Sequence, residues 1–322
     1  MYQILTSHPL FYFRLTGGYK EEVFFETNLP YYFPIYHMEK DLYVPNSIIL
    51  TYLHSIQSYD GNTLTNIAGK ATEFEYQDGE GEAARFYEVT HFTQLNDTQL
   101  LVVDSGNRRL RLIDRVTRAT SEFLSSNQYR NDYRMSNDHG AKVFKDFKDS
   151  NQVLSIASAY AEILYAIDIN YRNVSVFASW TGGYDLDIKC FTQHKDSGNI
   201  YVLVQYEDYY HIGYIDYESR LWSLFPSCGS SEGPLGSISN CNFNNHNYPF
   251  MFISPDKILL GYSSWDMHSI DVISNTTKEL SLTRNWHQIY SALVVGNTLY
   301  TGGEHGTVYS YTGKWFSMIA VV

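Results

Sequence analysis

The sequence predicts an all-β fold, a six-bladed β-propeller with four-stranded blades that forms a single domain over residues 1–322. Short apolar runs separated by turn residues recur six times, at a spacing of about 54 residues, which is within the range for propeller blades. No stretch of useful length has the 3.6-residue periodicity of a helix. No linker or charge block divides the chain, so one domain is expected although the length would allow two.

The clearest unit runs from residue 84 to residue 124. The apolar residues 99–104 are expected to form its second strand, and Asp104-Ser105-Gly106-Asn107 the turn that follows. Alternating leucines in residues 109–114 indicate the third strand, and residues 120–124 indicate the fourth. Gly106 is expected to supply a positive φ in the turn, where the Asp and Asn side chains can bond backbone amides.

The second strand, the turn and the third strand of this unit recur in five other segments. These are residues 48–60, 164–176, 200–216, 258–273 and 299–311. A ring of blades leaves no long open edge but needs a closing contact between the chain ends. Leu10–Leu15 and Trp315–Val321 are both strand-like, so we expect them to lie together in the closing blade.

One part of the chain resembles a known repeat family. Ile67-Ala68-Gly69, the segment from Asp78 to Phe86 and the segment from Val103 to Arg111 together look very like an NHL repeat. The resemblance covers residues 67–124, with a weaker echo over residues 229–273. It implies a six-bladed propeller. The other blades lack the Asp-x-Gly-Asn turn and match only in spacing and apolar pattern.

The charge balance is acidic and bears on the classes of partner. The chain has 23 Lys and Arg against 35 Asp and Glu, for a net charge of −12. Nucleic acids and anionic membranes need a basic surface, so neither is expected as a partner. The short basic cluster from Arg108 to Arg111, with Arg115, is interpreted as an outward-facing strand and its turn. The sequence contains no run of about 18 apolar residues, so no membrane-spanning helix is predicted.

Several features favour a secreted glycoprotein, with a cytoplasmic protein as the alternative. Sequons begin at Asn96, Asn173 and Asn275, each in an expected turn. Cys228 and Cys241 flank one Gly- and Ser-rich loop and could form a disulfide. Cys190 is left over as either a buried thiol or a reactive one. The start of the chain has neither the basic segment nor the apolar segment of a signal peptide.

Polar residues gather near one turn of several blades. When the blades are aligned on their third strands, a ring-like set results, consisting of His54, Arg108, Arg172, Tyr210, His268 and Gly306, with His211 and His305 one residue away. His54, His211, His268 and His305 could converge on a metal ion, zinc or calcium, although no cofactor is predicted. Histidine with arginine could instead hold an anion. The ordinary alternative is hydrogen bonding between blades.

Tyrosine is unusually frequent, with 29 residues in the chain. Tyrosine and tryptophan in loops offer large, rigid contact areas with a polar tip, which suits protein or carbohydrate partners. The alternative is that the rings fill space between blades, since aromatic residues favour strands. The candidate contact residues are Tyr206, Tyr209, Tyr210, Tyr262 and Trp265, with polar anchoring from His54, Arg108, Arg172 and His268.

The leading functional prediction is a non-enzymatic binding propeller. It would present an aromatic, His- and Arg-lined face at the mouth of the channel to a protein, a glycan or a small ligand. One alternative is a metal-dependent lyase or hydrolase with histidine ligands at the central channel. A second is a structural scaffold or oligomer. The sequence contains no Gly-x-Ser-x-Gly elbow, CxxC pair, P-loop or GxGxxG motif.

Overall fold

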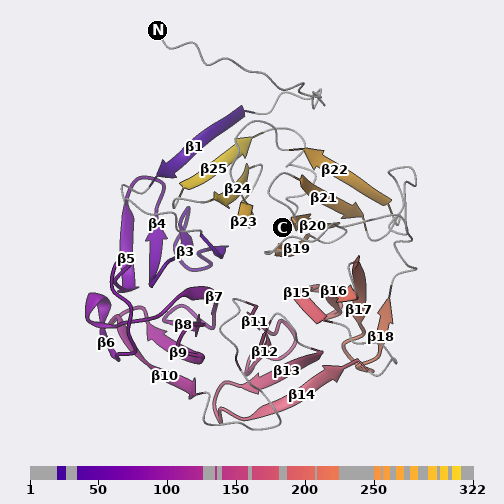
Figure 1. The fold of residues 1–322 in the computed structure, drawn as a ribbon, viewed down its shortest axis with the longest axis horizontal. Helices are drawn as coiled ribbons and strands as arrows, with labels where there is room; N and C mark the ends of the chain where they lie inside the picture. Colours follow the sequence, from indigo (N-terminus) through magenta and orange to yellow (C-terminus); the bar gives the residue numbers. More distant parts are fainter. Residues whose placement is uncertain are drawn as a thin grey trace.

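The protein is all-β in the residues that the structure describes. The computed structural model describes residues 20–26, 35–125, 135, 140–158, 162–180, 187–206, 209–224, 250–254, 257–261, 266–271, 276–281, 289–295, 298–303 and 307–312. Within them the only helix is the single 3₁₀ turn η1 (Gly81–Ala83). The strands form six sheets arranged around a common centre (Figure 1). The predicted all-β propeller class is therefore confirmed.

Sheets 1 to 3 come from the first half of the chain. Sheet 1 contains β2 (Met38–Lys40), β3 (Ile48–Tyr52), β4 (Ser55–Tyr59) and β5 (Leu64–Gly69). Sheet 2 contains β6 (Gly79–Glu80), β7 (Val89–Gln94), β8 (Gln99–Asp104), β9 (Arg109–Asp114) and β10 (Ala119–Ser125). Sheet 3 contains β11 (Lys142–Lys145), β12 (Gln152–Ile156), β13 (Ile163–Asp168) and β14 (Val174–Ser179).

Sheets 4 to 6 continue around the centre. Sheet 4 contains β15 (Asp187–Gln193), β16 (Ile200–Tyr206), β17 (Tyr209–Ile215) and β18 (Trp222–Leu224). Sheet 5 contains β19 (Phe250–Ser254), β20 (Lys257–Gly261), β21 (Asp266–Asp271) and β22 (Thr276–Ser281). Sheet 6 contains β23 (Ile289–Val295), β24 (Thr298–Gly303), β25 (Thr307–Thr312) and β1 (Lys20–Glu26).

All neighbouring strands are antiparallel, and this fixes where the turns lie. We call the four main strands of each sheet A to D, from the centre outward. The A–B and C–D turns then lie at one end of the ring, which we call the A–B end. The B–C turns and the connections between sheets lie at the other end, which we call the B–C end. Sheet 2 departs from the four-stranded expectation because the two-residue strand β6 pairs with the outer strand β10.

Strands from near the two chain ends meet in sheet 6. β1 pairs antiparallel with β25, with Lys20 opposite Thr312 and Glu26 opposite Thr307. The expected closing segments, Leu10–Leu15 and Trp315–Val321, lie outside the described residues. The observed strand β1 thus follows Leu10–Leu15 in the chain, and its partner β25 precedes Trp315–Val321.

One predicted segment was assigned to the wrong strands. Residues 164–176 were expected to form strands B and C, but they form β13 and β14, which are strands C and D of sheet 3. The true strand B is β12, which pairs with β11 and β13. The prediction failed because strands B, C and D of this sheet all contain apolar runs. An Asp at the end of a strand therefore marks a C–D turn as readily as a B–C turn.

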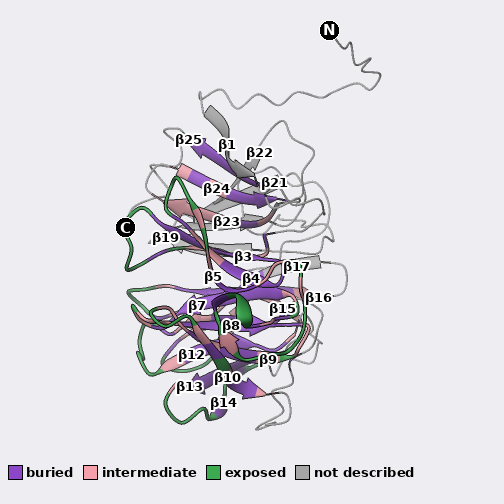
Figure 2. Cartoon of the chain, turned by 90° about the vertical axis from the view of Figure 1, so that its left-hand side faces the viewer, coloured by how far each residue is buried: buried purple, intermediate pink, exposed green. Residues whose placement is uncertain are grey.

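Sheets 1 to 3 are each buried on both faces. In β8, Leu100 and Val102 pack toward Ile49 of sheet 1, while Leu101 and Val103 pack with sheet 3. Successive side chains of a strand point to opposite faces, so burial of both faces requires the nearly unbroken apolar run seen in the sequence. Figure 2 shows the consequence for the strands whose burial is described, because they are mainly buried and the exposed residues lie mostly in the turns.

Three C–D turns share a pattern that the sequence analysis missed. Residues 114–118, 168–172 and 216–220 each read Asp-x-x-x-Arg. In each turn the Asp carboxylate accepts backbone N–H groups, as Asp168 does from Asn170 at 2.8 Å and from Tyr171 at 2.7 Å. The final arginine has a positive φ in all three turns, which closes the turn into the next strand.

The arginine of each turn reaches back to the D strand of the preceding sheet. Arg118 donates to the Ile67 carbonyl at 3.1 Å, and Arg172 donates to the Glu122 carbonyl at 3.3 Å. The Arg220 guanidinium lies 3.6 Å from the centre of the Phe177 ring. These contacts link sheets 1 to 4 along the A–B end.

Burial on both faces predicts a large stability difference between core and turn positions. Replacing Leu101 with alanine leaves a cavity between sheets 2 and 3 and should lower the free energy of unfolding by about 2–5 kcal/mol. The exposed Val116 lies in a C–D turn, so Val116→Ala should change it by less than about 0.5 kcal/mol. Urea denaturation of both variants measures the difference. Equal effects would show that the sheets do not pack as described.

Candidate functional site

The best-defined candidate site lies at the B–C end, between sheets 1 and 2. There the B–C turn of sheet 1 is tied to the loop of residues 70–88, which connects the two sheets. The backbone N–H of Glu88 donates to His54 Nδ1 at 2.9 Å, and the N–H of Val89 donates to the Leu53 carbonyl at 2.8 Å. Burial lowers the pKa of His54, which keeps its Nδ1 available as the acceptor at neutral pH.

Three rings meet at this junction and form what we call the aromatic patch, consisting of His54, Phe74 and Tyr87. The ring centres are 5.1 Å apart for Phe74 and Tyr87, 5.5 Å for His54 and Phe74, and 5.8 Å for His54 and Tyr87. His54 is buried, but Phe74 is 64% exposed and Tyr87 is 39% exposed. The patch therefore presents two aromatic side chains to solvent above a buried imidazole.

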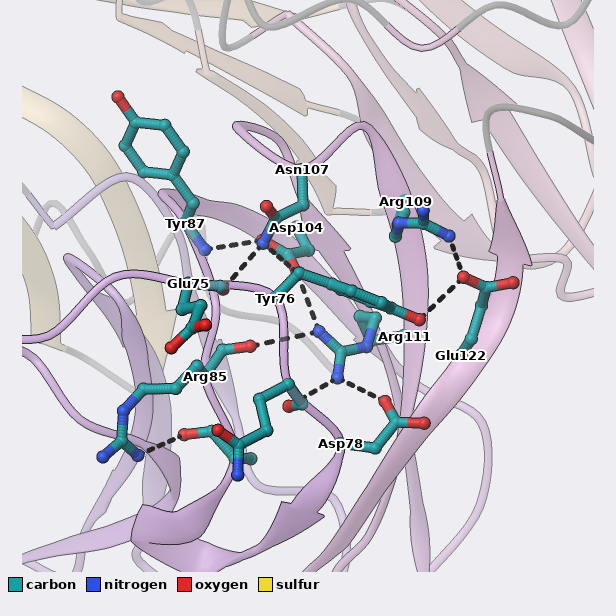
Figure 3. A network of polar contacts seen from close by, with 12 residues as sticks. Glu75, Tyr76, Asp78, Arg85, Tyr87, Asp104, Asn107, Arg109, Arg111 and Glu122 are labelled. Atoms are coloured by element: carbon teal, nitrogen blue, oxygen red, sulfur yellow. Dashed lines mark hydrogen bonds and ion pairs between the residues drawn. The ribbon is translucent and has the colours of Figure 1, made fainter.

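A buried arginine holds the loop of the patch in place (Figure 3). The Arg111 side chain is fully buried and donates to Asp104 Oδ2 at 2.9 Å and to Asp78 Oδ1 at 2.6 Å. It also donates to the backbone carbonyls of Gln77 at 3.0 Å and Arg85 at 3.2 Å. The interpretation of this basic segment as outward-facing is therefore wrong for Arg111. Its charge is neutralised inside the protein, where it cross-links strand β9 to the loop.

Asp104 connects the same network to the patch. Its carboxylate accepts the backbone N–H of Tyr87 at 2.8 Å and the side-chain amide of Asn107 at 2.9 and 3.0 Å. Burial raises the pKa of Asp104 to about 6, against the opposing effect of Asn107, Tyr87 and Arg111. The carboxyl group is therefore ionised at neutral pH and pairs with Arg111.

The B–C turn of sheet 2 approaches Tyr87 closely. The Gly106 N–H donates to the Tyr87 carbonyl at 2.7 Å. A Cβ atom on Gly106 would lie 2.6 Å from that carbonyl oxygen and 2.5 Å from the ring. The close contact with Tyr87 therefore explains the glycine. The predicted positive φ at Gly106 is wrong, because the residue of this turn with a positive φ is Arg108, at 54°.

Tyr76 fixes the outer part of the loop. Its ring lies under two guanidinium groups, with 4.2 Å from its centre to Arg109 Cζ and 4.7 Å to Arg111 Cζ. Its hydroxyl donates to Glu122 at 2.8 Å, and Glu122 also forms an ion pair with Arg109 (Figure 3). The loop thus contains a ring that packs against arginine side chains.

Two of the predicted arginines lie at opposite ends of the ring. Arg108 is exposed in the B–C turn of sheet 2, beside the turn contact with Tyr87. Arg172 lies in a C–D turn, so its predicted place among the B–C residues is wrong. Its guanidinium is 5.2 Å from the centre of the Phe123 ring and bonds the neighbouring backbone. Arg172 therefore joins sheets 2 and 3.

The other predicted residues can be placed only in part. Tyr206, Tyr209, Tyr210 and His211 lie in the β16–β17 hairpin, where Tyr206 pairs with Tyr209 at the B–C end. His268 lies within β21. The side chains of these five residues, and all of Tyr262, Trp265, His305 and Gly306, lie outside the described residues. In the described part no group of three or more His, Cys, Asp or Glu could hold a metal ion. The predicted histidine metal site stays a prediction.

A pair of histidines that was not predicted as a site lies near the centre of the ring. His37 precedes β2 and His91 lies in β7, and their rings stack with centres 3.6 Å apart. The Phe144 ring is 4.7 Å from that of His91, so rings from sheets 1 to 3 form a row. Burial lowers the pKa of His91 well below its usual value, and the nearby His37 and Lys142 add to the effect. The two histidines lie one repeat apart, and that spacing was the available signal.

The predictions for the three cysteines differ in how far the structure tests them. Cys190 is buried, and burial raises the pKa of its thiol to about 12. Of the two interpretations, the buried thiol is therefore correct and the reactive one is wrong, since nucleophilic attack requires the thiolate. Cys228 and Cys241 lie outside the described residues, so their disulfide stays a prediction. Among the described residues, no helix is long and apolar enough to span a membrane.

The arrangement of antiparallel sheets around a centre defines the chain as a β-propeller. Virginiamycin B lyase from Staphylococcus aureus is a similar solved structure, with a TM-score of 0.58 and 10% identity over 92% of this chain and 99% of that one. A streptogramin B lyase has the same TM-score and identity, over 92% and 98% of the two chains. The extracellular domain of a B. thetaiotaomicron protein has a TM-score of 0.56 and 11% identity, over 92% and 41%.

The sequence itself gives no closer assignment. No family model matches the chain, and no curated protein matches it. Identities of 10–11% with the solved structures show a shared fold and nothing of activity. The site must therefore be argued from its own residues.

The stacked histidines predict a loss of stability in mild acid. The folded pKa of His91 is depressed, so the unfolded chain takes up a proton first as the pH falls below about 6.5. Stability should be full above that pH and should decline below it by up to about 1.4 kcal/mol per pH unit. The free energy of unfolding, measured between pH 7 and pH 5, should fall less steeply in His91→Phe, which keeps a ring against His37.

Among the described residues, two other groups have shifted pKa values that bear on this pH range, and they act equally in both proteins. His54 also has a lowered pKa and adds to the decline. The raised pKa of Asp104 acts in the opposite sense below about pH 6. The comparison between the wild-type chain and His91→Phe cancels both effects. Identical slopes would rule out His91 as a source of the acid sensitivity.

Proposed function

We propose that the protein is a non-enzymatic binding propeller whose ligand site is the aromatic patch at the B–C end. One observation carries the proposal, namely that Phe74 and Tyr87 are exposed to solvent above a backbone that buried groups hold firmly. Exposed aromatic side chains on a rigid frame provide contact area at little entropic cost, because few rotatable bonds must be fixed on binding.

The predicted contact residues extend this proposed surface. His54 lies within the aromatic patch, and Arg108 lies in the adjoining turn of sheet 2. The hairpin of Tyr206, Tyr209 and Tyr210 belongs to the same end of the ring. We propose that a ligand, whether a protein, a glycan or a small molecule, contacts this end. Arg172 is excluded from the site because it lies at the A–B end.

We also propose the finer architecture. The six sheets would be the blades of one six-bladed ring, closed by the pairing of β1 with β25. Sheet 2 would be an NHL-type repeat. The support is that Asp104, Asn107 and Arg111, which carry the sequence resemblance, form one buried network. That network would give the motif a structural reason for its spacing.

We further propose a secreted, glycosylated protein. The support is the position of two sequons, since Asn96 lies in the A–B turn of sheet 2 and Asn173 is exposed in the C–D turn of sheet 3. Glycans require such accessible turns. Deglycosylation of the native protein with a peptide N-glycosidase should lower its mass, and an unchanged mass would remove this support.

The binding proposal is tested by a ligand screen with matched variants. Ligands that bind the folded state raise the melting temperature, so the wild-type chain should be scanned against peptide, glycan and small-molecule libraries. Each hit should then be titrated by calorimetry against the double variant Phe74→Ala and Tyr87→Ala. Loss of two contact rings should weaken binding about tenfold or more, since hot-spot aromatic residues contribute ~1 kcal/mol or more each.

Tyr171→Ala is the control variant. Tyr171 is 84% exposed, but it lies in a C–D turn at the other end of the ring. Its replacement removes an exposed ring without touching the aromatic patch, and it should leave the affinity of every hit unchanged. Hits that respond to Tyr171→Ala and not to the double variant would place the site at the A–B end and contradict the proposal.

A further inference from the structure

The loop that carries the aromatic patch is strongly acidic. Residues 70–88 contain six carboxylates and two basic side chains. Both basic side chains are already used, because Lys70 and Arg85 form ion pairs with Glu73. Asp78 is paired with the buried Arg111. The internal ion pairs therefore do not balance the negative charge of this loop.

Of the four other carboxylates, Glu88 is half-buried beside His54, and three are left over. Glu75, Glu80 and Glu82 are exposed and form no ion pair within the described residues. Glu75 lies between Phe74 and Tyr76, and its backbone N–H bonds the Phe86 carbonyl at 3.2 Å. Glu80 lies in β6, on the outer edge of sheet 2. Gly81, which lies between Glu80 and Glu82, is beside the Arg118 guanidinium at the A–B end. The exposed carboxylate at the aromatic patch is therefore Glu75.

The A–B end has a different charge arrangement. Each of its three Asp-x-x-x-Arg turns carries an arginine together with its aspartate, at residues 114–118, 168–172 and 216–220. Asp41 in the A–B turn of sheet 1 is paired with Arg115. A cationic partner would therefore be attracted to Glu75 at the aromatic patch more than to these turns.

The aromatic rings of the loop are already seen to pack with guanidinium groups. Tyr76 lies under Arg109 and Arg111, and the Phe86 ring is 5.1 Å from Arg111 Cζ. Guanidinium groups stack on aromatic faces and form fork-shaped hydrogen bonds with carboxylates. Phe74 and Tyr87, with Glu75 beside them, offer the same two kinds of contact to a group from outside.

We propose that the aromatic patch binds an arginine-rich segment of a partner protein. This inference rests on the proposed function and names the partner class for that site. Arginine side chains of the segment stack on Phe74 and Tyr87 and pair with Glu75. The exposed Arg108 opposes this binding, because its charge lies in the turn beside Tyr87.

The opposing signs of Glu75 and Arg108 give a direct test. The probe is a fluorescein-labelled peptide of four Arg-Gly-Ser repeats, and its affinity for the full chain is measured by fluorescence anisotropy near physiological salt. Loss of a cation–π contact in Phe74→Ala should weaken binding about fivefold. Glu75→Gln should weaken binding about two- to threefold, and Arg108→Gln should strengthen it about twofold.

Two controls separate specific binding from general attraction between opposite charges. A peptide of four Glu-Gly-Ser repeats should not bind, and Tyr171→Ala should bind the arginine peptide as the wild type does. If Phe74→Ala has no effect and affinity follows only the salt concentration, attraction is non-specific and the inference is overturned. If Arg108→Gln weakens binding of the arginine peptide, charge complementarity does not drive the binding and the inference is overturned.

Failure of this inference is distinguishable from failure of the proposed function. If the arginine peptide does not bind the wild-type chain, but hits from the ligand screen are lost in the Phe74 and Tyr87 double variant, the site is correct and the partner class is wrong. If neither the peptide nor any screened ligand depends on Phe74 or Tyr87, both are wrong.

Discussion

The burial of sheets 1 to 3 on both faces is the constraint on which the rest of the described structure depends. A strand such as β8 has no face left for solvent, because Leu100 packs toward sheet 1 and Leu101 toward sheet 3. Substitutions in such strands act on stability first, since they disturb two interfaces at once. The turns at the two ends of the ring are freer than these strands to differ between sheets, so a binding site is more easily built there.

The Arg111–Asp104 pair shows how one turn region is made rigid. A buried ion pair by itself is weak evidence for stability, because removing two charges from water offsets much of their attraction. Here the pair also positions the loop of residues 70–88. Arg111 bonds Gln77, Asp78 and Arg85 of that loop, and Asp104 accepts the backbone N–H of Tyr87. The exposed rings of the patch thus rest on a base cross-linked by several hydrogen bonds, which limits the entropy lost when a ligand binds.

The apolar runs predicted strands B and C correctly in five of the six segments, since burial on both faces leaves a strong pattern in the sequence. That pattern could not distinguish strand B from strand C in residues 164–176, and Arg172 was misplaced with them. The burial of Arg111 was also beyond sequence reasoning, because its partner Asp78 is far away in the sequence and meets it only when the loop folds back. Phe74 and Tyr87 were not proposed as contacts, because their exposure depends on the course of that long loop.

The two ends of the ring use their charges in different ways. At the A–B end, the Asp-x-x-x-Arg turns satisfy their own amides, and Arg118, Arg172 and Arg220 are used to join neighbouring sheets. The loop of residues 70–88 uses its two basic side chains internally and leaves Glu75 exposed at the B–C end, whereas its Glu80 and Glu82 lie beside Arg118 at the A–B end. Unpaired surface carboxylates give little to the stability of the fold. The charges at the A–B end thus serve cohesion, whereas those at the B–C end remain available to an oppositely charged ligand beside two exposed rings.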